Sequence, residues 1–185
     1  MPSLPLRFTV VCLSNQNRSM GAHNILSKRG FSVRSFRTGT NLKLPGRARD
    51  RPNVYDFRTT YKMYKDLLRK DKELSMQNGV LWMLERKIKP RPERFQDCKN
   101  PFDLILTCEE RVYDQVVEDT TSREQETCQP VHVVNVNNLE THKEATGAFL
   151  ICDPCQCIQL MEGMELLQVF KEKSGRNFLH TVCFY

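Results

Sequence analysis

One segment near the start of the chain constrains its fold more than any other feature. Residues 12–19 read Cys-Leu-Ser-Asn-Gln-Asn-Arg-Ser and lie between an apolar run, 8–11, and a helix-forming stretch, 20–28. A loop that connects a strand to the first turn of a helix can point its backbone N–H groups at one anion, which also meets the positive end of the helix dipole. The segment therefore predicts a strand, an anion-binding loop and a helix in direct succession.

The residue types in this segment are those that a cysteine phosphatase needs. The helix end favours the thiolate form of Cys12, which is the nucleophilic form. Arg18 is permanently charged, and its planar guanidinium can bind two phosphoryl oxygens at once. The Ser19 hydroxyl can donate a hydrogen bond to the sulfur of Cys12 from the first helical turn. The residues predicted to bind phosphate are Leu13, Ser14, Asn15, Gln16, Asn17, Arg18 and Ser19.

Coincidence is the alternative explanation of this motif. A cysteine followed six residues later by Arg-Ser also arises by chance, and a chain with 8 cysteines offers several opportunities. The context argues against chance, because the motif begins where a strand ends and a helix starts. Asn15 and Asn17 also tolerate the left-handed backbone that a tight anion loop requires. We therefore favour a phosphate-binding site.

Length and composition indicate one globular domain over residues 1–185. The chain has 39% hydrophobic residues, which is ordinary for a protein with a packed core. Its start has no signal-peptide pattern, and no apolar run approaches the roughly 18 residues that a membrane span needs. We expect a soluble intracellular protein with no membrane partner. In a reducing compartment its cysteines are expected to form no structural disulfides.

A net charge of +6 favours anionic partners, and the basic residues gather in segments 47–51 and 86–94. Such runs are usually solvated surface, which is the interpretation that we favour. The second interpretation is the attraction of a phosphorylated acidic partner. Direct nucleic-acid binding is disfavoured, because no recognised module or interleaved aromatic set accompanies the two runs.

Strand-like and helical patterns alternate along the chain. The runs typical of strands are 6–12, 31–36, 102–108, 131–136 and 178–184, and the helical patterns are 19–28, 59–70, 74–87, 109–118 and 143–173. This alternation predicts an α/β fold with a doubly wound, mostly parallel sheet of about five strands and helices on both faces. Ligands of such sheets bind beyond the carboxyl ends of strands, where Cys12 falls. Gly30 should end the first helix, and segments 37–53 and 88–101 are expected to be irregular binding loops.

The cysteines and histidines give little support to a metal site. Cys152, Cys155 and Cys157 have a spacing at which two thiolates can share a zinc, but no second pair follows at the spacing of a zinc finger. Their apolar neighbours favour a buried helix in which these cysteines are small core residues. The four histidines are scattered singly, and each is expected to be a packing or surface residue. They are His23, His132, His142 and His180.

A cysteine phosphatase normally also needs a general acid that protonates the leaving oxygen. The loop that follows segment 131–136 lies at the same edge of the predicted sheet as Cys12. Glu140 is the first carboxylate of that loop. A catalytic or formerly catalytic role and a plain solvated position both remain open for Glu140.

Long stretches of the chain resemble the Ssu72 phosphatase family, whose fold resembles the low-molecular-weight tyrosine phosphatases. Segment 22–36 reads Ala-His-Asn-Ile-Leu-Ser-Lys-Arg-Gly-Phe-Ser-Val-Arg-Ser-Phe, and segment 178–185 reads Phe-Leu-His-Thr-Val-Cys-Phe-Tyr. The other matching stretches are 11–12, 18–20, 52–57, 102–114 and 122–132. Together they cover nearly the whole chain, so the resemblance is highly specific.

The resemblance implies a protein phosphatase that acts on phosphoserine followed by a cis proline in the carboxy-terminal domain of RNA polymerase II. Cys12 would be the nucleophile and Arg18 the phosphate clamp, and no metal or other cofactor would be needed. The family loop that holds the peptide matches Lys43, Leu44 and Pro45. Family members work in mRNA 3′-end processing through a symplekin-type scaffold. The expected location is the nucleus, with the cytoplasm as the alternative.

The chain also departs from the pattern that the resemblance leads us to expect. The family has aspartates in the loop after the fourth strand, and one of them is the general acid. This chain has Glu140 at the position of that acid and Asn137 at the position of another family aspartate. Arg37 replaces an expected glycine, and Gly21 replaces a helix-favouring acidic residue at a cost of about 1 kcal/mol in helix propensity.

These departures indicate a diverged paralogue, for which two functions remain. The first is an active protein phosphatase. The second is a weakly active or inactive paralogue that binds phosphoserine peptides without efficient turnover. A redox relative such as an arsenate reductase is a more distant third, because it needs a resolving cysteine close to Cys12 and none is evident.

Overall fold

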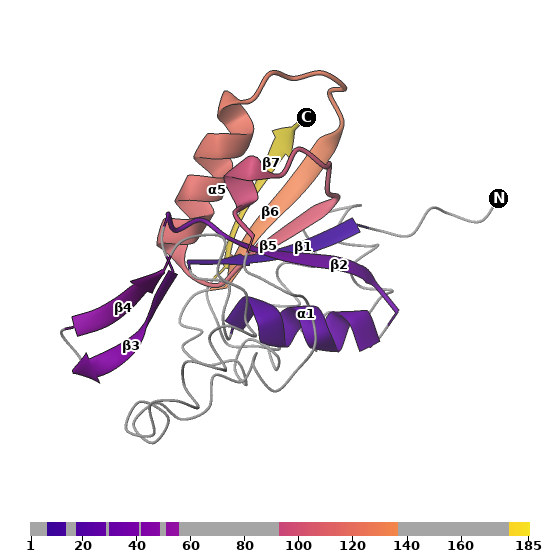
Figure 1. Cartoon of the computed structure of the whole chain (residues 1–185). Helices are drawn as coiled ribbons and strands as arrows, with labels where there is room; N and C mark the ends of the chain where they lie inside the picture. Colours follow the sequence, from indigo (N-terminus) through magenta and orange to yellow (C-terminus); the bar gives the residue numbers. More distant parts are fainter. Residues whose placement is uncertain are drawn as a thin grey trace.

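A five-stranded sheet with the order β2-β1-β5-β6-β7 forms the centre of the computed structural model (Figure 1). The structure describes residues 7–13, 18–28, 30–40, 42–48, 51–55, 93–136 and 178–185. The strands of the sheet are β1 (Arg7–Cys12), β2 (Ser32–Arg37), β5 (Leu104–Thr107), β6 (Pro130–Val136) and β7 (Phe178–Phe184). All neighbouring pairs are parallel except β6 and β7. The predicted mostly parallel α/β sheet is therefore confirmed.

The predicted strand over 102–108 is shorter in the structure, where β5 covers Leu104–Thr107 and the two residues before it make side-chain contacts. The backbone N–H of Phe102 donates to Oη of Tyr185 at 2.9 Å. The Asp103 carboxylate accepts bonds from Arg7, at 2.8 Å from its backbone N–H, 3.1 Å from Nε and 2.9 Å from Nη2. These contacts connect the start of β1 with the start of β5.

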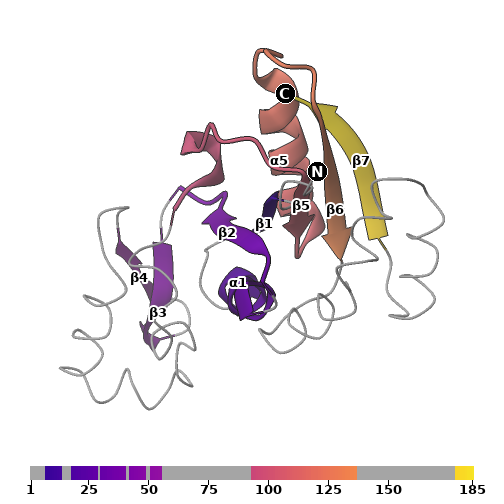
Figure 2. The same ribbon diagram turned by 90° about the vertical axis from the view of Figure 1, so that its right-hand side faces the viewer.

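Two helices cover opposite faces of the sheet (Figures 1 and 2). Helix α1 (Arg18–Lys28) packs on β1 and β2, and α5 (Glu110–Ser122) packs on β5, β6 and β7. Successive residues of a strand point to opposite faces, so each face takes every second residue. Ser35 of β2 contacts α1 through His23, whereas its neighbour Phe36 lies in the core beneath α5. The prediction of helices on both faces is confirmed for these two helices.

Helix α1 ends at Lys28, and Gly30 forms its C-terminal cap, as predicted. The backbone N–H of Gly30 donates to the carbonyl of Ser27 at 3.1 Å, and that of Phe31 donates to the carbonyl of Leu26 at 3.2 Å. Gly30 has a φ of 88°. This pair of bonds is a Schellman motif, which requires a residue with positive φ directly after the helix. The motif directs the chain from α1 into β2.

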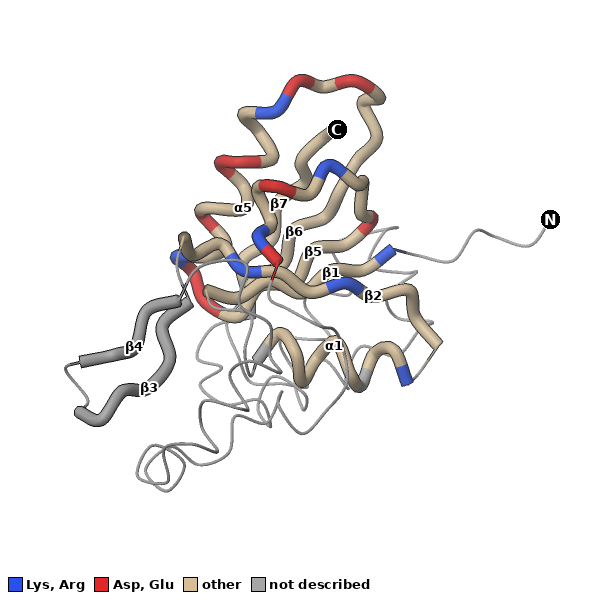
Figure 3. The backbone as a smooth tube through the Cα atoms, viewed as in Figure 1, with Lys and Arg blue, Asp and Glu red and all other residues tan. Residues whose placement is uncertain are grey.

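Helix α5 is amphipathic, which explains why it lies on the sheet as it does. Val112, Val116 and Thr120 are buried, whereas the acidic residues recur along the side that faces solvent (Figure 3). The buried valines belong to a core that is formed with the strands and with the 3₁₀ turn η1 (Phe95–Asp97). Its buried members are Val11, Phe36, Phe95, Phe102, Ile105, Val112, Val116, Val131, Val133 and Cys183. Burial of each large apolar side chain contributes about 1.5–3 kcal/mol.

The prediction that segment 37–53 is irregular was wrong. The structure has an antiparallel hairpin there, formed by β3 (Leu42–Ala48) and β4 (Arg51–Tyr55). Its register shifts between Leu44 and Ala48. Pro45 has no N–H to donate to the ladder, and Gly46 follows it, so this stretch favours such an irregularity. A proline and a glycine therefore interrupt a strand in this segment.

Several predictions lie outside the described residues. They are the helices over 59–70, 74–87 and 143–173 and the cysteines at 152, 155 and 157. No disulfide joins the five cysteines in the described part of the chain. No helix there has the length and apolar character needed to cross a membrane.

Candidate active site

Cys12 is the last residue of β1, at the carboxyl edge of the sheet. Its Sγ lies 3.0 Å from Oγ of Ser19, and both residues are buried. Ser19 belongs to the first turn of α1, so the strand and the helix hold the two atoms together from opposite ends of the loop. The predicted contact between the sulfur and the hydroxyl is present. A serine hydroxyl in this position can donate a hydrogen bond to a thiolate.

The start of the loop is fixed by backbone hydrogen bonds from the residues that follow β2. The N–H of Thr38 donates to the carbonyl of Cys12 at 3.2 Å, and that of Gly39 donates to the carbonyl of Leu13 at 3.0 Å. These two bonds join the segment after β2 to the backbone at the end of β1. The side chain of Leu13 packs against the core beneath α5. The backbone of Cys12 and Leu13 is therefore held in place by the sheet itself.

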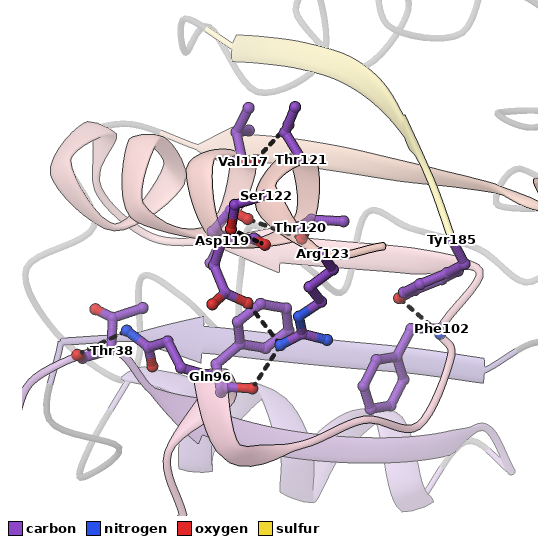
Figure 4. Close-up of polar contacts among 12 residues, drawn as sticks. Thr38, Gln96, Phe102, Val117, Asp119, Thr120, Thr121, Ser122, Arg123 and Tyr185 are labelled. Carbon is purple, nitrogen blue, oxygen red and sulfur yellow. Dashed lines mark hydrogen bonds and ion pairs between the residues drawn. The ribbon is translucent and has the colours of Figure 1, made fainter. Parts of the chain in front are cut away.

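A chain of contacts supports this position from α5 (Figure 4). Nε2 of Gln96 donates to the carbonyl of Thr38 at 3.2 Å, which attaches η1 to the segment after β2. Nη2 of Arg123 donates to the carbonyl of Phe95 at 3.2 Å, and its guanidinium lies 5.2 Å from the centre of the Phe95 ring. Arg123 also forms an ion pair with Asp119, with an N···O distance of 2.6 Å. Helix α5 is thus connected, through η1, to Thr38, whose N–H binds the carbonyl of Cys12.

Arg37 also lies in this region, although it is not part of the motif in segment 12–19. It ends β2, and it is the register partner of Cys12 on the neighbouring strand. Its side chain is 0% exposed. In the sequence, Arg37 is a charged residue directly after the strand-like run 31–36. Its pairing with Cys12 follows only from the register of the sheet.

A second polar pair lies farther along the same edge. Oγ1 of Thr107 donates to Oδ1 of Asn135 at 2.7 Å, and both side chains are buried. Thr107 is the last residue of β5 and the register partner of Val11, so the pair lies beside the strand that carries Cys12. This hydrogen bond aligns the ends of β5 and β6, from which the loop with the expected general acid departs.

The remaining predicted site residues are not brought together in the described part of the chain. Ser14, Asn15, Gln16, Asn17 and Glu140 lie outside it, and so does the side chain of Arg18, whose backbone starts α1. The predicted peptide-binding residues Lys43, Leu44 and Pro45 lie in β3. Their roles stay predictions.

Two histidines that look isolated in the sequence meet in the sheet. Nδ1 of His132 on β6 lies 3.0 Å from Nε2 of His180 on β7, and the rings are nearly parallel. Burial lowers the pKa of His132, and burial together with the charge of His132 lowers the pKa of His180. In the ranges that the structure describes, no group of three or more histidine, cysteine or acidic side chains has the geometry of a metal site.

Comparisons with known proteins identify the relatives of this chain. The model of the Ssu72-like protein family matches residues 6–185. Human SSU72, named as a phosphatase of the RNA polymerase II C-terminal domain, is 75% identical over 194 residues, with 100% of both chains covered. The human SSU72 like protein 3, also named as a phosphatase of this domain, is 58% identical over the same coverage.

Solved structures from Drosophila melanogaster have the same fold. The serine phosphatase of the RNA polymerase II C-terminal domain from this organism has a TM-score of 0.84 and 49% identity, covering 97% of this chain and 100% of that one. Drosophila Ssu72 with symplekin and a cis peptidomimetic phosphoserine peptide of that domain has a TM-score of 0.83 and 48% identity, covering 97% and 98%.

Proposed function

Because the chain belongs to the Ssu72 family, we propose that it removes phosphate from phosphoserine-proline sites of the RNA polymerase II carboxy-terminal domain. The enzyme is a cysteine-dependent protein-serine phosphatase that forms one catalytic domain over residues 1–185. The observation that carries this proposal is the position of Cys12, whose sulfur lies at the carboxyl edge of the sheet beside the hydroxyl of Ser19.

The reaction proceeds in two displacements at phosphorus. In the first, the thiolate of Cys12 attacks the phosphoryl group, a sulfur–phosphorus bond forms, and the bond to the serine oxygen breaks. Glu140 gives its proton to that departing oxygen, because an alkoxide leaves poorly. In the second, water attacks the cysteinyl-phosphate while Glu140 takes a proton from it, and inorganic phosphate leaves as the thiolate is restored.

The other residues of the loop stabilise the charge that develops on the phosphoryl oxygens. We assign the binding of the anion to backbone N–H groups of residues 13–19, and the binding of two of its oxygens to the guanidinium of Arg18. The hydroxyl of Ser19 stabilises the thiolate of Cys12 before attack and after product release. Lys43, Leu44 and Pro45, on the β3–β4 hairpin, hold the substrate peptide.

A weakly active or inactive paralogue that only binds phosphoserine peptides is the less favoured alternative. The relatives at 75% and at 58% identity are both named as phosphatases. The contact between Cys12 and Ser19 also supports turnover, because a hydroxyl beside the sulfur can stabilise the thiolate that attacks phosphorus. We therefore assign turnover to this chain.

The partners follow from the same family membership. The Drosophila relative forms a complex with symplekin and a phosphoserine peptide. We assign this chain a symplekin-type scaffold and the phosphorylated polymerase tail as partners, in mRNA 3′-end processing. Such a role places the protein in the nucleus.

Two substrates test the proposal. The full chain should hydrolyse an aryl phosphate and release phosphate from a heptad peptide phosphorylated on the serine before proline, and Cys12→Ser should abolish both reactions. Cys128→Ser is the matched control, because Cys128 is exposed and lies on the loop between α5 and β6. Activity that survives in Cys12→Ser, or that is absent from the folded wild-type chain, would contradict the proposal.

A further inference from the structure

Arg37 is the register partner of Cys12 on the neighbouring strand, and its side chain lies fully inside the protein. Its exposure is 0%, and its three guanidinium nitrogens are shielded from solvent. Arginine stays protonated in proteins, so this position holds a permanent positive charge in a region of low dielectric constant. Such a charge attracts an anion at a given distance several times more strongly than an exposed charge does. A phosphoryl group bound by the loop of Cys12 would lie in the field of this charge.

The register of the sheet places Arg37 and Cys12 on the same face. The two residues are Cα partners on parallel neighbouring strands, and such strands lie about 4.8 Å apart. Partners in a parallel pair point to the same side of the sheet. For β2 this side is identified by Ser35, two residues before Arg37, whose Oγ contacts His23 and Met20 of α1. Arg37 thus points to the side from which α1 and the sulfur of Cys12 approach the loop.

The backbone holds Arg37 firmly in this position. Its N–H donates to the carbonyl of Glu93 at 2.8 Å on the outer side of β2, and Thr38 binds the carbonyl of Cys12 on the inner side. The Glu93 carboxylate accepts a bond from Arg34 at 3.0 Å, and Arg34 lies over the ring of Phe36. Arg34 therefore belongs to the opposite face of the same strand.

We propose that Arg37 is a second cation of the phosphate site, placed beneath the loop that carries Cys12, and that its charge raises the affinity of this loop for a phosphoryl dianion. This inference rests on the proposed function, since it assumes that the loop binds phosphate. It adds to the loop a positive charge that lies outside the segment 12–19. Arg37 acts from the sheet side, whereas the residues of the loop contact the anion directly.

The affinity of the full chain for tungstate, a stable oxyanion, tests the inference by isothermal titration calorimetry. Arg37→Met keeps an unbranched side chain without the charge, and it should weaken tungstate binding by roughly 10-fold to 100-fold. Arg37→Lys restores the charge and should bind at least about 5-fold more tightly than Arg37→Met, given that one charge is regained. Arg34→Met is the matched control, because it removes an arginine from the opposite face of β2. It should leave tungstate affinity unchanged, whatever its effect on the melting temperature.

The outcomes separate the two proposals. Wild-type protein that fails to bind tungstate overturns the proposed function and this inference with it. Wild-type binding that Arg37→Met leaves unchanged, or that Arg37→Lys loses as completely as Arg37→Met, overturns this inference alone.

A second measurement applies if Arg37→Met does not fold. The Nε–H resonance of Arg37, assigned by its loss in Arg37→Lys, should shift when tungstate is added to the wild-type chain. A resonance that stays in place while tungstate binds would overturn the inference.

Discussion

Nδ1 of His132 and Nε2 of His180 lie 3.0 Å apart across the antiparallel pair β6 and β7. At this distance one ring donates an N–H to the bare nitrogen of the other, so at least one of the two rings is neutral. The two histidines are separated by 48 positions in the chain and meet only because β7 returns beside β6.

This pair predicts that the folded state becomes less stable in mild acid. Burial lowers the pKa of both histidines, so the unfolded chain binds protons more readily than the folded chain. The two neutral histidines contribute their full stabilisation of the folded state above the ordinary histidine pKa of about 6.5, and this contribution is lost as the pH falls below that value. Urea unfolding between about pH 7.5 and pH 5.5 should show a steeper fall for the wild type than for a His132→Gln, His180→Gln double variant. Equal slopes in the two proteins would contradict this prediction.

A separate loss of stability is expected at lower pH from Asp103. Burial acts to raise the pKa of this carboxyl, but hydrogen bonds from the side chain and backbone of Arg7, together with its charge, outweigh burial and lower the pKa. The contribution is therefore present above the ordinary aspartate pKa of about 3.9 and is lost as the pH falls below it. Asp103→Asn should reduce the free energy of unfolding at neutral pH by about 1 kcal/mol and flatten its acid dependence. Asp114→Asn, on the exposed side of α5, is the control and should change neither.

Ser19→Ala should slow turnover without preventing folding. It removes the hydroxyl that lies 3.0 Å from the sulfur of Cys12, and a hydrogen bond to a charged group is worth about 1.5–3 kcal/mol, or roughly 10-fold to 100-fold in rate. The measurement is kcat for an aryl phosphate at saturating substrate. Ser27→Ala, on the exposed side of the same helix, should retain the wild-type rate. If both variants react as fast as the wild type, the contact has no role in the chemistry.

Gly30→Ala should destabilise the fold by about 1–2 kcal/mol, because an L-residue with a side chain is strained at a φ of 88°. A Cβ atom at this position would meet no atom within 4 Å, so the loss comes from the backbone conformation and not from a clash. Gly30→Asn should cost less, since asparagine tolerates the left-handed region. Urea midpoints of the two variants check this order, and a larger loss for Asn would contradict it.

Glu140→Asp should raise activity on phosphoserine peptides more than on an aryl phosphate. A glutamate in place of an aspartate displaces the proton donor by on the order of 1 Å, which can slow a reaction about 100-fold. An aryl phosphate has a good leaving group and needs little protonation, so the penalty should concentrate on phosphoserine. Glu140→Gln should correspondingly depress the peptide reaction selectively. Equal effects on both substrates would show that the general acid lies elsewhere.

Local patterns in the sequence were sufficient to predict the strand and the helix on either side of the segment that begins at Cys12. The apolar run before Cys12 and the stretch ending at Gly30 predicted β1 and α1 to within one residue, because strand and helix periodicity and a glycine cap act over a few neighbouring residues. The alternation of strands and helices likewise predicted a parallel sheet, since parallel strands need long connections of this kind. Local patterns also explain why segment 37–53 was wrongly predicted to be irregular. Its Pro-Gly pair after Leu44 is typical of a loop, but a strand with a bulge also accommodates it.

The pairings across the sheet were decided only by the tertiary structure. Arg37 beside Cys12, Thr107 beside Asn135 and His132 beside His180 each join residues from different strands. A shift of one residue in register would turn every one of these side chains to the other face. Register is set by the combined burial of many apolar residues on both faces, and no local pattern around a single arginine or histidine carries that information. The sequence by itself therefore determined the strand and helix around Cys12 and the kind of sheet, and the packing of the whole sheet determined which side chains from different strands meet.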